Sequence, residues 1–240
     1  TATGERTRLV ASGVVEVEQL DWNPIDRRLA YSLGNTTTVV DMSGELPEVT
    51  LRDPEGPGLM GSIAWTSDGR DIATNTYVID RRHPENNIFN IQIWREEQLL
   101  SGGNITNPSI RFSGGGRRLF WSPDGNWIAN NYATGGVTIF DADTGEQTFL
   151  STGGTEDIAA IAWSPDSTQV AAGGIGGIWI WDIASEQIVN TISVDAAVGS
   201  MIWSPTLGLI HNGAGNGLFQ NGTLVTAPIM STTTTPTAGP

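Results

Sequence analysis

A repeat of about forty residues runs through the 240-residue chain and constrains its fold more than any other feature. Five apolar segments share a tryptophan, and most continue into a turn-forming stretch; the tryptophans are Trp22, Trp65, Trp121, Trp163 and Trp203. They are spaced 43, 56, 42 and 40 residues apart. A period of about 40 to 45 residues is typical of proteins in which each copy folds as four short strands.

One copy, residues 119–153, shows how the unit is built. Short apolar strands are expected at 119–121, 127–129, 137–140 and 147–150. The first turn is Ser122-Pro123-Asp124-Gly125, where Pro presets φ, Asp can bond its own backbone and Gly accepts positive φ. Such a sheet is apolar on both faces and has to be sandwiched between copies. We therefore predict an all-β fold, a β-propeller of four-stranded antiparallel blades with about five blades in this chain.

A second anchor follows each tryptophan at a similar distance. Apolar stretches end at Asp41, at Asp141 and at the dipeptide Trp181-Asp182, whereas the second copy ends at Arg95. The two anchors together resemble the WD40-repeat family, whose repeats carry an apolar strand ending in Trp-Asp. The resemblance covers roughly residues 5–230. It implies that most repeated Trp and Asp residues are structural, with the tryptophans packing between blades.

The chain also departs from the best-known WD40 pattern, because no copy has the Gly-His pair that precedes the first strand. Trp121-Ser-Pro-Asp-Gly125 looks instead like bacterial WD40 and TolB-type propellers. Without that pair, we expect the blades to cohere by apolar packing and turn chemistry, without a repeated polar network.

The blade count is left as two alternatives. Thr3–Val10 reads like an outer strand, so the ring either closes with five blades or is part of a larger propeller. We assign 1–230 to the propeller domain and 231–240, a Thr/Pro-rich stretch, to a linker or tail. The tail and the absent initial Met favour a longer polypeptide and, slightly, an extracellular or cell-envelope location over the cytoplasm.

The charge and composition of the chain limit the classes of partner that it can bind. The net charge is −14 and the 12 basic residues are all Arg, so nucleic acid and anionic membranes should repel the chain. There is no Cys, and no apolar run reaches the length of a spanning helix. We expect no cofactor, no transmembrane segment in this chain, and a protein or peptide partner.

Binding residues are sought where the repeat is broken. The longest interval contains two additions, Tyr77–Asn87 and Ser101–Asn107. Loops on a rigid ring commonly carry binding residues. The first addition includes a basic patch on an acidic chain. This patch would suit an acidic ligand; alternatively, the addition is a solvated insertion whose charges form local ion pairs. Together with one tryptophan outside the repeat, the candidate residues are Tyr77, Arg81, Arg82, His83, Asn86 and Trp127.

Metal binding and catalysis find little support. Asp141 and Asp143 begin like a calcium loop, but Thr152 stands where that loop needs Glu, so they are weak metal candidates. The chain has two His residues, His83 and His211, and no nucleophile-elbow motif. We therefore predict no catalytic residues.

Three functions remain open at this point. The first is a non-catalytic interaction or scaffolding domain, part of a larger bacterial protein. The second is a propeller hydrolase or sugar-binding lectin that uses the mouth of the central funnel. The third is a structural subunit of an extracellular or envelope assembly.

Overall fold

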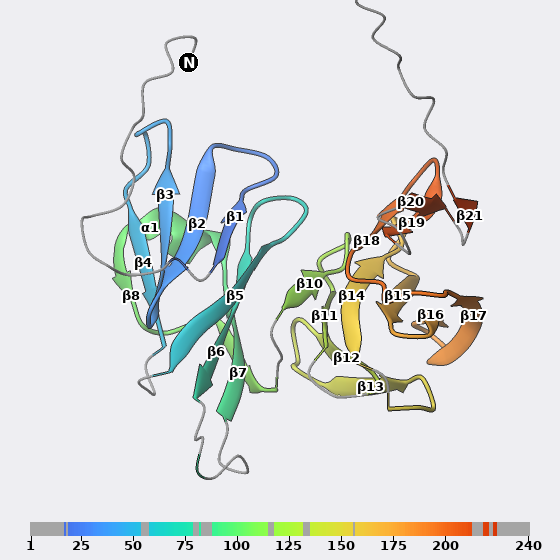
Figure 1. Ribbon diagram of the computed structural model, residues 1–240. Helices are drawn as coiled ribbons and strands as arrows, with labels where there is room; N and C mark the ends of the chain where they lie inside the picture. The colour runs from blue at the N-terminus through green and yellow to red at the C-terminus, as the bar shows by residue number, and fades with distance from the viewer. Residues whose placement is uncertain are drawn as a thin grey trace, which may run out of the picture.

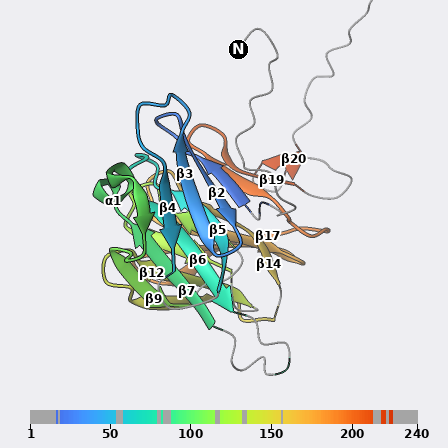
Figure 2. The same ribbon diagram turned by 90° about the vertical axis from the view of Figure 1, so that its left-hand side faces the viewer.

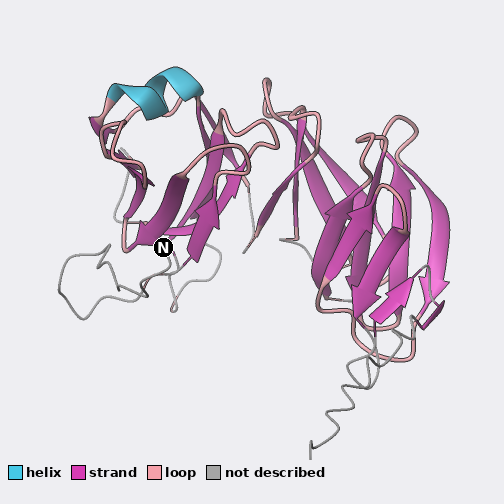
Figure 3. Cartoon of the chain, turned by 90° about the horizontal axis from the view of Figure 1, so that it is seen from above, coloured by secondary structure: helices cyan, strands magenta, loops and turns pink. Residues whose placement is uncertain are grey.

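A computed structural model describes residues 17, 19–53, 58–78, 82, 88–114, 118–131, 135–155, 157–212, 218–220 and 223–224. The described residues form five sheets and one helix, and the sheets follow one another in chain order around an arc (Figure 1). The view from above shows the two ends of this arc apart (Figure 3). The predicted all-β propeller of four-stranded antiparallel blades is confirmed.

Each blade begins with the strand that carries its repeat tryptophan. Blade 1 contains β1 (Gln19–Trp22), β2 (Arg28–Leu33), β3 (Thr36–Asp41) and β4 (Val49–Arg52). Blade 2 contains β5 (Leu59–Trp65), β6 (Ile72–Val78), β7 (Ile88–Trp94) and β9 (Ile110–Ser113). Blade 3 contains β10 (Leu119–Trp121), β11 (Trp127–Asn130), β12 (Gly136–Asp141) and β13 (Gln147–Ser151).

The last two blades repeat the same antiparallel order. Blade 4 contains β14 (Ile158–Trp163), β15 (Gln169–Gly174), β16 (Gly177–Asp182) and β17 (Gln187–Ser193). Blade 5 contains β18 (Met201–Ser204), β19 (Gly208–Asn212), β20 (Leu218–Gln220) and β21 (Thr223–Leu224). The first strands pack side by side in the order β1, β5, β10, β14, β18, so β1 and β18 are the two ends of the series.

In blades 2, 3 and 4 the turn after the tryptophan is built from a hydroxyl and a carboxylate. Ser122 Oγ accepts a hydrogen bond from the Trp127 N–H at 2.9 Å and donates to Asp124. Ser164 repeats this arrangement in blade 4 and donates to Asp166 at 2.7 Å. The recurring Trp-Ser-Pro-Asp stretch is thus explained by turn geometry.

The repeat tryptophans join neighbouring blades. Three indole N–H groups donate to the main-chain carbonyl just before the preceding blade's tryptophan: Trp65 to Asp21 at 3.3 Å, Trp121 to Ala64 at 2.9 Å and Trp163 to Phe120 at 2.9 Å. These three side chains are buried, and Trp203 is half-buried. Trp22 is exposed, because no blade precedes it within the described residues. Within the described residues, Trp22 therefore lacks the packing between two blades that is expected of the repeat tryptophans.

Blade 2 contains a buried hydrogen-bonded chain that the sequence did not predict. Trp94 Nε1 donates to Thr74 at 2.9 Å, and Thr74 donates to Gln92 at 3.1 Å. Gln92 then donates to Thr76 at 3.1 Å, and Thr76 donates to Asp53 at 2.7 Å. All five side chains are buried. In blade 2 a connected polar network therefore joins the strands in addition to the expected apolar packing and turns.

An addition to blade 2 reaches back to blade 1. After β7 the chain forms α1 (Glu96–Ser101) and then β8 (Gly103–Ile105), which pairs in parallel with β4 as a fifth strand of the blade 1 sheet. Leu99 of α1 is buried in the core shared by blades 1 and 2. Figure 2 shows α1 on the outside of the sheets. In the part of the chain that the structure describes, no helix is long and apolar enough to cross a membrane.

Candidate functional site

The strands of blade 2 end in a cluster of apolar side chains beside the first sequence addition. We call this cluster the blade 2 tip, and it consists of Leu59, Tyr77, Val78, Ile88 and Phe89. Leu59 pairs across the strands with Tyr77, and Tyr77 pairs with Phe89, so these three share one face of the sheet; Val78 and Ile88 pair on the other. Leu59 and Ile88 are exposed and the other three are half-buried.

The aromatic residues of the tip are held in place by their neighbours. The rings of Tyr77 and Phe89 stack with centroids 6.5 Å apart. The Tyr77 ring also lies over Gly61, where a Cβ would stand only 3.0 Å from Cε1 of the ring. Aromatic side chains fixed on a sheet beside exposed aliphatic ones are the composition enriched at the centre of protein interfaces.

The structure brings together only part of the predicted binding set. Tyr77 belongs to the blade 2 tip, and Arg82 is exposed in the loop that follows it. The predicted residues Arg81, His83 and Asn86 lie outside the described residues.

Trp127 lies away from the blade 2 tip. It begins the second strand of blade 3, whereas Tyr77 lies at the end of the second strand of blade 2, so the two occupy opposite ends of their blades. Trp127 is half-buried against the core shared by blades 3 and 4. The structure therefore does not join Trp127 to the other predicted binding residues.

Four members of the tip are absent from the predicted binding set, namely Leu59, Val78, Ile88 and Phe89, although Val78 lies inside the first addition. They are of the same residue types as the core positions of other strands, and nothing local marks them as exposed. The available signal was the length of the addition at Tyr77–Asn87, which lets β6 and β7 extend.

The carboxylates of the two weak metal candidates, Asp141 and Asp143, make different contacts. The Asp141 carboxylate accepts hydrogen bonds from the Asp143 and Thr144 N–H groups at 3.0 and 2.7 Å. The bond from Thr144 lowers the pKa of Asp141, and Asp141 therefore acts as the cap of its own turn. Asp143 instead pairs with Arg95 of blade 2 at 2.7 Å. Among the described residues no three His, Cys, Asp or Glu side chains gather where they could hold a metal ion.

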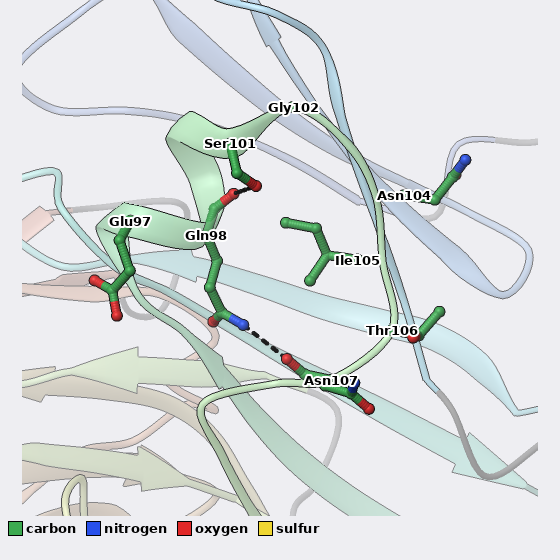
Figure 4. Close-up of a pocket in the computed structure, with 8 residues that line it drawn as sticks. All are labelled: Glu97, Gln98, Ser101, Gly102, Asn104, Ile105, Thr106 and Asn107. Atoms are coloured by element: carbon green, nitrogen blue, oxygen red, sulfur yellow. Dashed lines mark hydrogen bonds between the residues drawn. The ribbon is translucent and has the colours of Figure 1, made fainter.

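The second addition and α1 line an open hollow (Figure 4). Its volume is about 450 Å³, and Gln98 Nε2 closes one side by donating to the Asn107 carbonyl at 2.7 Å. The side chain of Ile105 points into the space between α1 and the returning chain. The lining residues are Glu97, Gln98, Ser101, Gly102, Asn104, Ile105, Thr106 and Asn107. Amides and hydroxyls predominate, so the hollow offers hydrogen bonds and few charges.

The tip and the hollow belong to opposite ends of β7. The tip includes the first residues of β7, whereas α1 follows its last residue, Trp94. One compact ligand cannot reach both.

Comparison with known proteins gives the class of repeat. No family model matches the chain. It is 38% identical over 177 residues to "WD repeat-containing protein 1" of Bos taurus, which covers 59% of this chain and 29% of that protein. It is 27% identical over 194 residues to "WD repeat-containing protein slp1" of Schizosaccharomyces pombe, covering 79% and 36% respectively.

Two further comparisons extend over most of the chain. "Cell division cycle 20.5, cofactor of APC complex" of Arabidopsis thaliana is 29% identical over 222 residues, covering 82% of this chain and 43% of that protein. The solved β-propeller domain of Myceliophteria thermophila Cps50 (Swd1) matches with a TM-score of 0.63 at 15% identity, covering 88% of this chain and 70% of that domain. The chain spans half the length, or less, of the curated relatives that it matches. These comparisons support a WD-repeat type of propeller.

Proposed function

We propose that this chain is a non-catalytic protein-interaction domain, a rigid propeller scaffold that binds a protein or peptide partner through the blade 2 tip. The observation that carries the proposal is the exposure of Leu59 beside the stacked Tyr77 and Phe89 on one face of the sheet end, together with the exposure of Ile88 on the other face. Apolar side chains gathered at one exposed place indicate an interaction site more than single scattered ones do.

The tip suits binding because its backbone is already ordered. Its residues lie on paired strands, so a partner would lose little affinity to the ordering of this surface. Covering one large aliphatic side chain removes apolar surface worth about 1.5 to 3 kcal/mol when burial is complete. Arg82, in the adjoining loop, would lie at the rim of such an interface and face an acidic or polar group of the partner.

The comparisons support the same class of function. One relative is named as a cofactor of a complex, which is a role in a protein assembly. We carry over to this chain the general role of an interaction scaffold. Within the proposal, 1–230 form the propeller domain of a larger protein, and 231–240 are a linker or tail. The Trp-Ser-Pro-Asp-Gly stretch at 121–125 supports a bacterial, TolB-like subtype as part of the same proposal.

The test compares a tip variant with a matched surface variant. Leu59→Ser/Ile88→Ser removes both exposed aliphatic side chains, whereas Ile175→Ser removes one from the exposed turn between β15 and β16 of blade 4. Each purified chain is immobilised and exposed to extract of the source cells, and retained proteins are quantified by mass spectrometry.

We expect proteins that bind the unaltered chain and Ile175→Ser to be retained at least about ten-fold less by the tip variant, since a loss of 1.4 kcal/mol is ten-fold in affinity. Circular dichroism checks that both variants keep the β fold. Equal retention by all three chains would overturn the blade 2 tip as the binding surface.

A further inference from the structure

The addition α1–β8 leaves apolar side chains exposed where it meets blade 1. Leu100, in the last turn of α1, is 42% exposed, and Leu46, in the turn between β3 and β4, is 38% exposed. Pro47 is also exposed and lies against the end of the addition, since a Cβ on Gly102 would stand 2.8 Å from Cβ of Pro47. We call Leu46, Pro47 and Leu100 the α1 patch.

The backbone under the α1 patch is held in place on both sides. The Gly103 N–H donates to the Glu48 carbonyl at 2.9 Å, where β8 begins to pair with β4. Leu99, the neighbour of Leu100, is buried in the core shared by blades 1 and 2, so it anchors α1. The patch is therefore ordered before any partner arrives, which limits the entropic cost of covering it.

Three carboxylates without a basic partner surround the patch. Glu45 and Glu48 flank its two turn residues in sequence, and Glu97 lies one helical turn before its leucine on α1. All three are exposed. The salt bridges among the described residues include none of them. The patch thus combines apolar surface with negative charge that the chain does not neutralise.

Basic side chains near this end of blades 1 and 2 are mostly engaged elsewhere. Arg95 is held by two aspartates, each at 2.7 Å, and Arg70 lies 3.7 Å and 3.9 Å from two other carboxylates. Arg27 is exposed beside the turn between β3 and β4, because its carbonyl accepts a main-chain N–H from that turn. One arginine cannot balance three carboxylates, so the surface is complementary to a segment that is both apolar and basic.

The open hollow of the second addition adjoins the patch and adds acceptors for a cation. Gly102, which lies against Pro47, also lines the hollow, whose volume is about 450 Å³ (Figure 4). Glu97 is the charged residue among its described lining residues. The last turn of α1 contains no basic residue, so its carbonyl oxygens keep their partial negative charge. A lysine or arginine side chain would find both room and charge-assisted hydrogen bonds there.

We propose that the α1 patch docks a segment of a protein partner in which an aliphatic side chain stands beside lysine or arginine. The aliphatic side chain covers Leu46 and Leu100, and the cationic one enters the hollow beside Glu97. The net charge of −14 favours the approach of such a basic segment. The α1 patch is separate from the blade 2 tip, so this inference goes beyond the proposed function and does not depend on it.

The test uses two peptides of equal length as probes, one of Arg-Leu-Gly repeats and one of Arg-Ser-Gly repeats. Each carries an uncharged fluorophore and is titrated with the purified chain at low ionic strength, and binding is followed by fluorescence anisotropy. We expect the unaltered chain to bind the leucine peptide at least about ten-fold more tightly than the serine peptide. Equal affinity for both, or no binding of the leucine peptide, would overturn the proposal.

The apolar part of the patch is tested with Leu46→Ser/Leu100→Ser. We expect this variant to bind the leucine peptide at least about ten-fold more weakly than the unaltered chain does. The matched control Ile175→Ser/Leu207→Ser removes two aliphatic side chains that are 67% and 51% exposed on blades 4 and 5, and it should leave the affinity unchanged. Equal weakening by the two variants would count against the α1 patch.

The charged part of the site is tested with Glu48→Gln/Glu97→Gln. This variant is expected to bind the leucine peptide at least about five-fold more weakly than the unaltered chain, since it loses two carboxylates beside the patch. The control Glu146→Gln/Asp195→Asn removes two exposed carboxylates from blade 3 and from the bend after blade 4, and should have little effect. If both variants weakened binding equally, the general acidity of the chain would be the cause and the site would be refuted.

Two further measurements separate this site from misfolding and from the blade 2 tip. Circular dichroism and thermal unfolding show that each variant keeps the β fold. The tip variant Leu59→Ser/Ile88→Ser is expected to bind the leucine peptide as the unaltered chain does. A loss of peptide binding in that variant alone would place the peptide at the tip and overturn the α1 patch.

Discussion

The recurring aspartates at the ends of the third strands act as caps for the turns that follow. The carboxylate of Asp41 accepts the N–H groups of Ser43, Glu45 and Leu46 at 2.8 to 2.9 Å. Asp182 similarly accepts from the N–H and hydroxyl of Ser185. A negatively charged acceptor satisfies turn donors more strongly than a neutral one does. The repetition of Asp is therefore explained by backbone hydrogen bonding, without a ligand.

A pH-dependent stability effect is predicted for Asp41. Hydrogen bonds from the Ser43 hydroxyl, then from main-chain N–H groups, lower its pKa from 3.8 to about 2. Because the folded-state pKa is lower than the unfolded one, this stabilisation is complete above pH 3.8 and is lost as the pH falls to about 2. Asp41→Asn should therefore lower the urea midpoint at pH 7 and have little effect near pH 2.

The control for Asp41 is Asp195→Asn, which makes the same charge change at an exposed bend. It is expected to change the urea midpoint little at either pH. If Asp41→Asn and Asp195→Asn lowered the midpoint equally at pH 7, net charge would be the cause and the turn bonds would be unimportant.

At the level of elements, the addition α1–β8 is fitted closely to blade 1. Gly102 joins the helix to β8 with φ of +74°, and a Cβ on it would stand 2.8 Å from Cβ of Pro47. Gly103 also has positive φ, +81°, but a Cβ there would meet nothing within 4 Å. An alanine at either position would have an unfavourable positive φ, but only an alanine at Gly102 would also clash with Pro47.

We predict that Gly102→Ala weakens the attachment of β8 to β4 more than Gly103→Ala does. Both substitutions carry the cost of positive φ, about 1 to 2 kcal/mol, and the first adds the clash with Pro47. Amide hydrogen exchange of β8 and of the outer edge of β4 provides the measurement. Equally fast exchange in both variants would mean that Pro47 moves aside to make room for the new Cβ, and that the positive φ alone weakens the attachment of β8.

The sequence predicted those elements whose signals are local and repeated. The tryptophan spacing and the turn residues located the first strands and their turns, since each signal recurs within every unit. The pairing of β8 with β4 joins residues 103–105 to 49–51, a long-range contact that no local pattern encodes. The exposure of Leu59 and Ile88 was equally hidden, because it depends on where neighbouring strands stop.

At the scale of the whole molecule, each blade depends on the blades beside it. The cores lie between blades, and each one contains side chains from two neighbouring blades. Stability in such a chain is close to a sum of blade terms and nearest-neighbour interface terms. The same substitution should therefore have different effects at an occupied junction and at an open end.

The repeat tryptophans allow this to be tested with one chemical change at two equivalent positions. Trp163→Phe removes the indole bond to the Phe120 carbonyl and leaves space between blades 3 and 4, so the free energy of unfolding should fall by about 1 to 3 kcal/mol. Trp22→Phe removes an exposed indole and should change it by less than about 0.5 kcal/mol. Urea unfolding followed by circular dichroism measures both. A comparable loss from Trp22→Phe would mean that Trp22 is packed in solution, and hence that the arc closes on itself.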